Sequence, residues 1–146
     1  MKKRKMLAIS ASLRNARWGK GIVDLIESIK SIESKEELKQ FLSSEAKIHY
    51  QQFLDAGREE GMQFDEIYRN LKKLKGKKGL CNSEVGMVAA LWAAHNDGSD
   101  IEYLPLSSYF KANGSEKDLS ILKDKIMSCD GLILCSPVYL DRKSVV

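Results

Sequence analysis

MLAISASLR, residues 6–14, is the stretch of sequence that decides the fold of this 146-residue chain. Four apolar residues lead directly into a segment that carries two hydroxyls and a guanidinium, on Ser10, Ser12 and Arg14. In open α/β sheets, a buried strand that ends in small hydrogen-bond donors presents a phosphate-binding loop at the carboxyl edge of the sheet. The stretch therefore predicts a strand over residues 5–10 with an anion-binding loop after it, although an ordinary turn between a strand and a helix has the same pattern.

The composition is typical of one soluble globular domain. Hydrophobic residues make up 43% of the chain and charged residues 30%, and a chain of this length can bury one modest core but not two. No apolar stretch approaches the roughly 20 residues of a membrane span. Too few apolar residues follow the basic N-terminus for a signal peptide. We therefore expect a cytoplasmic protein that does not associate with membranes.

Residues that carry metal or nucleophilic chemistry are scattered. The three cysteines lack CxxC spacing, which argues against a disulfide framework and against a zinc site. His49 and His95 are isolated, so we expect no metal ligands and no catalytic side chain. Five lysines within residues 72–78 could face nucleic acid, but no aromatic residues alternate with them, and a solvated helix end is the better interpretation. We expect no nucleic-acid partner.

Hydrophobic periodicity predicts an alternation of strands and helices. The strands are expected over residues 5–10, 101–106 and 131–136. Apolar spacings of three and four residues predict helices around 22–29, 38–54, 64–71, 85–94 and 119–129. The segment 85–94 is apolar nearly all round and predicts a buried helix, with Asn82 and Ser83 as candidate N-caps. The continuous apolar run of the third strand predicts burial on both faces. This βαβαβ order predicts a parallel sheet with right-handed crossovers.

Two loops are the expected ligand-binding segments, one after Ile9 and one after Cys135. The first contains no glycine before Gly19, which excludes the GxGxxG fingerprint and the P-loop. It must therefore bind phosphate through hydroxyls, backbone N–H groups and the guanidinium of Arg14. A phosphate also favours a helix N-terminus, and the start of the buried helix at Asn82-Ser83-Glu84 is the candidate.

The end of the third strand carries the most specific motif, Ser136-Pro137-Val138-Tyr139. Its proline fixes the backbone, and the two residues after it can turn their N–H groups towards the polar edge of a flavin ring. Together with residues 9–14, 82–84 and 130–135, this motif resembles the flavodoxin-like NAD(P)H-dependent FMN reductase family over little more than half of the chain. The resemblance implies that one group of residues grips the FMN phosphate, namely Ser10, Ser12, Leu13, Arg14, Asn82 and Ser83. It implies that a second group holds the isoalloxazine, namely Ser136, Pro137, Val138 and Tyr139.

The resemblance also implies a fold. We expect an α/β, flavodoxin-like three-layer sandwich over residues 1–146, with only the first three strands of its parallel sheet, in the order 2-1-3. A helical insertion over about residues 19–79 follows the first strand, and we expect a truncated chain that forms a homo-oligomer. The sequence departs from the family pattern at Ala11 and at Leu140, positions where the family usually has glycine.

The implied activity is electron transfer from NAD(P)H through FMN to a small acceptor, if the chain is completed. This chemistry needs no catalytic side chain, because the cofactor carries the hydride. Two alternatives stay open. One is a non-catalytic FMN-binding electron carrier that docks a redox partner protein through the helical insertion, and the other is a short form that binds no flavin.

Overall fold

The computed structural model describes residues 2–11, 20–59, 79–106 and 119–136, and they form an α/β fold with one parallel sheet. The strands are β1 (Lys5–Ser10), β2 (Asp100–Pro105) and β3 (Gly131–Cys135). β1 lies in the middle, and both neighbours run parallel to it in the order β2-β1-β3. The predicted α/β fold, the parallel sheet and the order 2-1-3 are confirmed.

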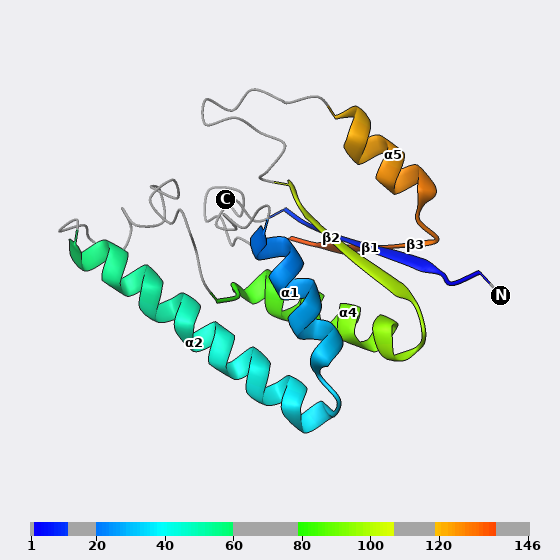
Figure 1. Cartoon of the computed structure of the whole chain (residues 1–146). Coiled ribbons are helices and arrows are strands. Elements are labelled where there is room, and N and C mark those ends of the chain that lie inside the picture. The colour runs from blue at the N-terminus through cyan, green and yellow to red at the C-terminus, as the bar shows by residue number, and fades with distance from the viewer. Residues whose placement is uncertain (1, 12–19, 60–78, 107–118, 137–146) are drawn as a thin grey trace, which may run out of the picture.

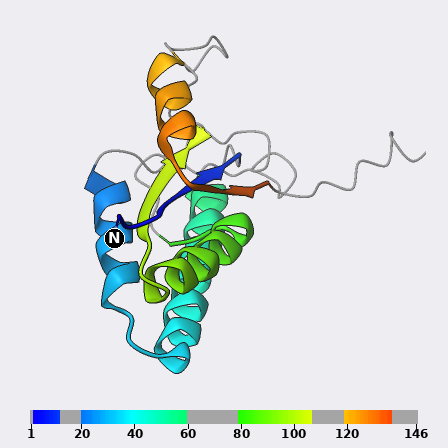
Figure 2. The same cartoon turned by 90° about the vertical axis from the view of Figure 1, so that its right-hand side faces the viewer.

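Four helices in the described part of the chain cover the two faces of this sheet unequally. α4 (Asn82–Asn96) packs across all three strands, α1 (Lys20–Ser31) packs on α4 and β2, and α2 (Lys35–Glu59) lies outermost against α4 (Figure 1). α5 (Ser120–Ser128) lies on the opposite face against β1 (Figure 2). The connection from β1 to β2 therefore runs over one face, and the connection from β2 to β3 runs over the other.

β1 is buried on both faces, as a central parallel strand should be. Its side chains alternate between the faces because successive residues of a strand point in opposite directions. Leu7 and Ile9 form a small core with Leu122 of α5. Ala8 belongs to the larger core on the α4 side, and Ser10 is fully buried.

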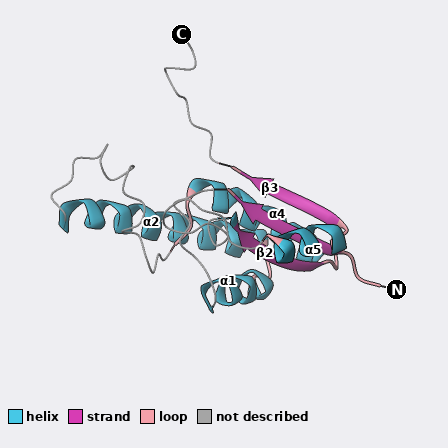
Figure 3. Ribbon diagram, turned by 90° about the horizontal axis from the view of Figure 1, so that it is seen from above, coloured by secondary structure: helices cyan, strands magenta, loops and turns pink. Residues whose placement is uncertain are grey.

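β3 is a strand as expected, but the prediction that both of its faces are buried is wrong. Ile133 and Cys135 pack against the core on the α4 side. On the other side Leu132 and Leu134 are 41% and 69% exposed. Figure 3 shows β3 beside the area that α5 covers. An apolar run can therefore identify a strand without showing that a helix lies over both faces.

α4 begins at a different cap from the predicted one. Its N-cap is Cys81, not Asn82 or Ser83, because the Glu84 carboxylate reaches back and accepts a hydrogen bond of 3.2 Å from the Cys81 N–H. As expected of a buried helix, α4 packs on the sheet, and its buried apolar face is formed by Met87, Val88, Leu91 and Trp92. Gly86 on its other side is exposed.

Trp92 joins α4 to the segment that connects α1 with α2. The indole is 7% exposed, and its Nε1–H donates a hydrogen bond of 2.9 Å to the carbonyl oxygen of Ile32. A buried indole N–H needs such an acceptor, because an unpaired buried donor costs free energy. The contact fixes where α1 ends relative to the core.

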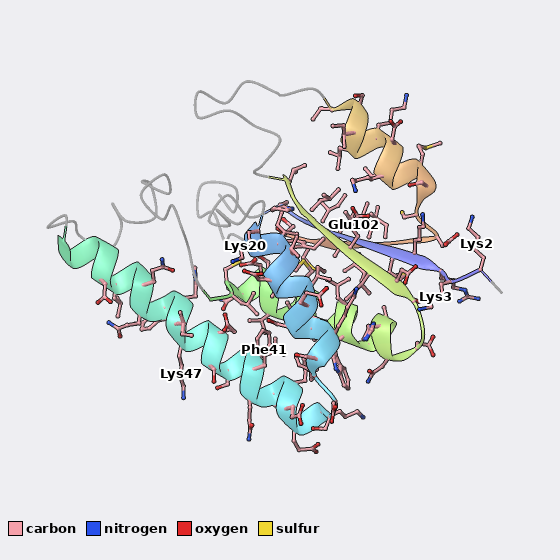
Figure 4. The ribbon with its side chains drawn as sticks, viewed as in Figure 1. Lys2, Lys3, Lys20, Phe41, Lys47 and Glu102 are labelled. Atoms are coloured by element: carbon pink, nitrogen blue, oxygen red, sulfur yellow. The ribbon has the colours of Figure 1, made fainter. Side chains whose placement is uncertain are left out.

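Helices follow β1 as expected in the part of this segment that the structure describes. The expected helices around 22–29 and 38–54 are α1 and α2, whereas the expected helix at 64–71 lies outside the described residues. α2 packs through the half-buried Phe41, and Figure 4 shows Lys47 on the side of α2 that faces away from α4. No helix in the described ranges combines the length and apolar character needed to cross a membrane.

Gly79 lies just before α4, where the description of the chain resumes. This glycine has a φ of 85°, a left-handed conformation that residues with a Cβ rarely adopt. An added Cβ would also lie 2.5 Å from the Glu45 carbonyl oxygen and 2.5 Å from the His49 backbone nitrogen. The next residue, Leu80, donates its N–H to the same Glu45 carbonyl at 3.1 Å. Glycine thus lets the chain pass directly against α2 before α4 begins.

Candidate functional site

The loops after β1 and β3 leave the sheet side by side at its carboxyl edge. Ser10 and Cys135 are register partners at the ends of these strands. Beyond them the Ala11 N–H donates a hydrogen bond of 2.8 Å to the carbonyl oxygen of Cys135. The crossovers on either side of β1 run over opposite faces, so this edge is a topological switch point. Ligands of open α/β sheets bind in the crevice at such a point.

A buried chain of hydrogen bonds lies directly beneath this edge. The Ser10 hydroxyl and the Tyr103 phenol lie 2.8 Å apart, and the phenol donates to Glu84 Oε2 at 3.2 Å. Exposure of these three residues is 0% for Ser10, 1% for Tyr103 and 0% for Glu84. Because the phenol has one proton and gives it to Glu84, the serine must be the donor in the first bond.

This network ties the start of α4 to the first two strands. Glu84 uses Oε1 for the Cys81 N–H and Oε2 for the Tyr103 phenol, so one carboxylate serves both the helix cap and the sheet. A buried carboxylate without such donors would be strongly destabilising. The N-terminus of α4 is therefore held in a fixed position at the edge where the loops after β1 and β3 begin.

The first turn of α4 presents backbone donors towards solvent. Asn82 is exposed and Ser83 is half-buried, and the Ser83 hydroxyl lies 3.3 Å from the Cys81 thiol. The first hydrogen bond between turns of the helix runs from Val85 N–H to the Cys81 carbonyl oxygen at 3.0 Å. Asn82 and Ser83 are the first two residues of α4, where helix geometry provides no carbonyl partner for the backbone N–H groups. These two donors are suited to bind an anion.

Cys135 adds a thiol to the same edge. Burial raises the pKa of the Cys135 thiol above its ordinary value, and the nearby Cys81 thiol raises that pKa further. Both effects act against the thiolate, because a buried negative charge loses hydration and a second one nearby repels it. At neutral pH Cys135 is therefore a protonated thiol.

Four of the ten predicted site residues lie in the described part of the chain. The structure brings Ser10, Asn82, Ser83 and Ser136 to one edge of the sheet, with Ser10 buried and Ser136 exposed. The other six lie outside the described residues, and they are Ser12, Leu13, Arg14, Pro137, Val138 and Tyr139. The Ser10 hydroxyl, expected to donate to a phosphate, donates to Tyr103 instead, and the roles of the other three residues stay predictions.

Sequence reasoning placed Glu84 in the helix start but did not predict its buried hydrogen bonds, and it did not include Cys81 or Tyr103 in the site. Tyr103 alternates with apolar residues along β2, and this spacing indicates only that it faces the core. Glu84 stands three residues after Cys81, the spacing of a capping box, but cysteine in place of serine or threonine conceals that pattern. The position of Glu84 three residues after Cys81 was the one sequence feature that could have indicated this capping box.

Metal ligands are not gathered at this edge. In the ranges that the structure describes, no three His, Cys, Asp or Glu side chains come together in a way that could hold a metal ion.

The chain was compared with known proteins at the levels of sequence and structure. No family model, no curated protein and no solved structure matches it.

Proposed function

We propose that the chain binds FMN at the carboxyl edge between β1 and β3, as a flavodoxin-like module for electron transfer from NAD(P)H to a small acceptor. The observation that carries this proposal is the switch point between β1 and β3. Flavodoxin-like sheets start with the same strand order and bind FMN at this point. Domains that bind no flavin share the order, so the choice of FMN rests on the motif Ser136-Pro137-Val138-Tyr139 that follows β3.

The donors at this edge fit the phosphate of FMN. The N–H groups of Asn82 and Ser83 are available to it, and the helix dipole favours a negative charge there. Ser10 stabilises the end of β1 at this edge, since its hydroxyl is hydrogen-bonded to Tyr103. In this proposal Ser12 and Arg14 supply the remaining hydroxyl and the charge-assisted hydrogen bonds.

Glu84 has a defined part in the same proposal. Both of its carboxylate oxygens accept hydrogen bonds from the protein. These bonds hold the side chain beneath the helix cap, so that Glu84 positions the start of α4. When bound, FMN supplies the hydride and electron chemistry, and the protein supplies position and exclusion of water.

Comparison of FMN with riboflavin tests the phosphate site. A flavin-fluorescence titration of the wild-type chain should give tighter binding of FMN than of riboflavin, by about 10-fold or more if one charge-assisted bond contributes roughly 1.5–3 kcal/mol. Arg14→Ala should remove most of that preference and leave riboflavin binding unchanged. Arg4→Ala is the matched control, because Arg4 lies at the amino end of β1, and it should keep the preference.

Failure of the wild-type chain to bind either flavin would refute the proposal. Equal affinity for FMN and riboflavin would refute the phosphate site while leaving a flavin site. If both variants lose the preference equally, the effect comes from general charge and not from Arg14.

A second function, a non-catalytic electron carrier, is favoured by exposed apolar side chains on two flanks of α2. Two large side chains on this helix, Ile48 and Tyr50, are 44% and 60% exposed, which suits the docking of a partner protein. Anaerobic mixing of the FMN-loaded chain with NADPH or NADH separates the two functions. Rapid loss of flavin absorbance is expected of the reductase, and an unchanged spectrum is expected of the carrier.

A further inference from the structure

Two cysteines lie at the carboxyl edge of the sheet, one on each side of the junction between sheet and helix. Cys135 is the last residue of β3, and its side chain packs on the core that includes α4. Cys81 is the N-cap of α4 and is 5% exposed. Both are free thiols in the structure.

Strand register and the hydrogen-bond network bring these two residues to the same edge of the sheet, on the face that α4 covers. Cys135 is the register partner of Ser10, and in-register residues of neighbouring parallel strands project to the same face, roughly 5 Å apart. From Ser10 the network runs through Tyr103 to Glu84, whose carboxylate lies 3.2 Å from the Cys81 nitrogen.

The two thiols also interact electrostatically. They are near enough for the charge on one to disfavour the charge on the other. α4 packs on both β1 and β3, so the helix start and the strand end belong to one packed unit. The position of each thiol is therefore fixed relative to the other by strand register and by the helix cap.

We propose that Cys81 and Cys135 form a reversible disulfide that joins the start of α4 to the end of β3. The oxidant is a small-molecule disulfide such as oxidised glutathione. The more accessible Cys135, which is protonated at neutral pH, first loses its proton to a buffer base. Its thiolate then attacks one sulfur atom of the oxidant and releases the first small thiolate. Cys81 then attacks Cys135 Sγ and releases the second. Two protein thiols are oxidised, one small disulfide is reduced to two thiols, and the two protons pass to the leaving thiolates.

Cys129 provides a matched control within the same chain. It stands just before β3, at the amino edge of the sheet, and its thiol donates to the Ile126 carbonyl oxygen at 3.1 Å. Six residues of mostly extended chain separate it from Cys135, which places it roughly 15–20 Å from the proposed disulfide. Oxidation that depends on position should therefore leave Cys129 unpaired.

The full-length chain is the material for the test. The Cys129→Ser variant is equilibrated in buffers with increasing ratios of oxidised to reduced glutathione, quenched with acid and alkylated. The intact mass should fall by that of two hydrogen atoms, with no added glutathione. Cleavage before aspartate under non-reducing conditions should then yield fragment 65–96 joined to fragment 130–140, which contain Cys81 and Cys135.

Reduction should separate the two fragments, and the wild-type chain should give the same joined pair with Cys129 alkylated. Cys81→Ser and Cys135→Ser should each give only a mixed disulfide with glutathione on the remaining cysteine of the pair, while far-UV circular dichroism shows that the fold is kept. Two added glutathiones on the Cys129→Ser chain would overturn the proposal. A joined pair formed only between two chains, or no oxidation at all, would overturn it too. None of these outcomes depends on FMN, so the proposal stands or falls separately from the proposed function.

Discussion

Replacement of Tyr103 by phenylalanine tests the buried hydrogen-bond network most directly. The change removes one oxygen atom and keeps the ring that is 1% exposed in the core. Glu84 loses a donor to its carboxylate, an interaction that contributes about 1.5–3 kcal/mol, and Ser10 loses a neutral acceptor at about 0.5–1.5 kcal/mol. Both residues keep other interactions, so we expect Tyr103→Phe to lower the free energy of unfolding by about 2–3 kcal/mol.

Urea unfolding followed by far-UV circular dichroism measures this loss. The midpoint should fall while the dependence of the unfolding free energy on urea stays the same, because the surface exposed on unfolding hardly changes. Tyr50→Phe is the matched control. Tyr50 is 60% exposed, and the same atom removed there should change stability by less than about 0.5 kcal/mol. Equal effects of the two variants would refute the network as a stabilising element.

Three further predictions concern a turn, a strand face and a thiol. Gly98→Ala should destabilise by about 1 kcal/mol, the cost of its φ of 91° alone, whereas Gly79→Ala should cost clearly more in the same urea assay because the new Cβ meets backbone atoms. Equal losses would contradict the close approach to α2. Leu134→Ala should change stability by less than about 0.5 kcal/mol, but Leu91→Ala, at a fully buried position, should cost about 2–5 kcal/mol. The rate of Cys135 alkylation by iodoacetamide should rise with pH, and the midpoint of this rise should lie above the pKa of an ordinary cysteine thiol. The raised pKa keeps the Cys135 thiol protonated to higher pH. A midpoint at or below that pH would contradict the burial of this thiol.

The order of elements could be predicted because each one rests on local periodicity. β1 has the expected bounds, and α1, α2, α4 and α5 lie where apolar residues repeat at helical spacing. The parallel sheet followed from the alternation of strands and helices. What local patterns could not show is which faces are covered. The continuous apolar run of β3 indicates a strand, but the exposure of Leu134 depends on where α5 packs.

The candidate site was less predictable, because its contacts join distant parts of the sequence. Ser10 was identified by its place after a buried strand, and that reasoning is local. Its partner Tyr103 is 93 residues away, and only the register of β1 with β2 brings the two hydroxyls together. The N-cap was predicted one or two residues late because the helix start is determined by the Glu84 side chain and not by the amide and hydroxyl at 82–83.

The central position of β1 has a consequence for the order of events during folding. Lys5 pairs with Asp100, and Met6 pairs with Gly131, so each strand pair joins residues separated by about 95 and 125 positions. At synthesis rates of about 5–20 residues per second, β1 leaves the ribosome roughly 5–20 s before β2 exists to pair with it. During that interval the segment is an apolar strand without neighbours, while α1 and α2 can already form from local contacts. These two helices pack on α4 and β2, which are made later than both helices, so sheet formation is the late and slow step.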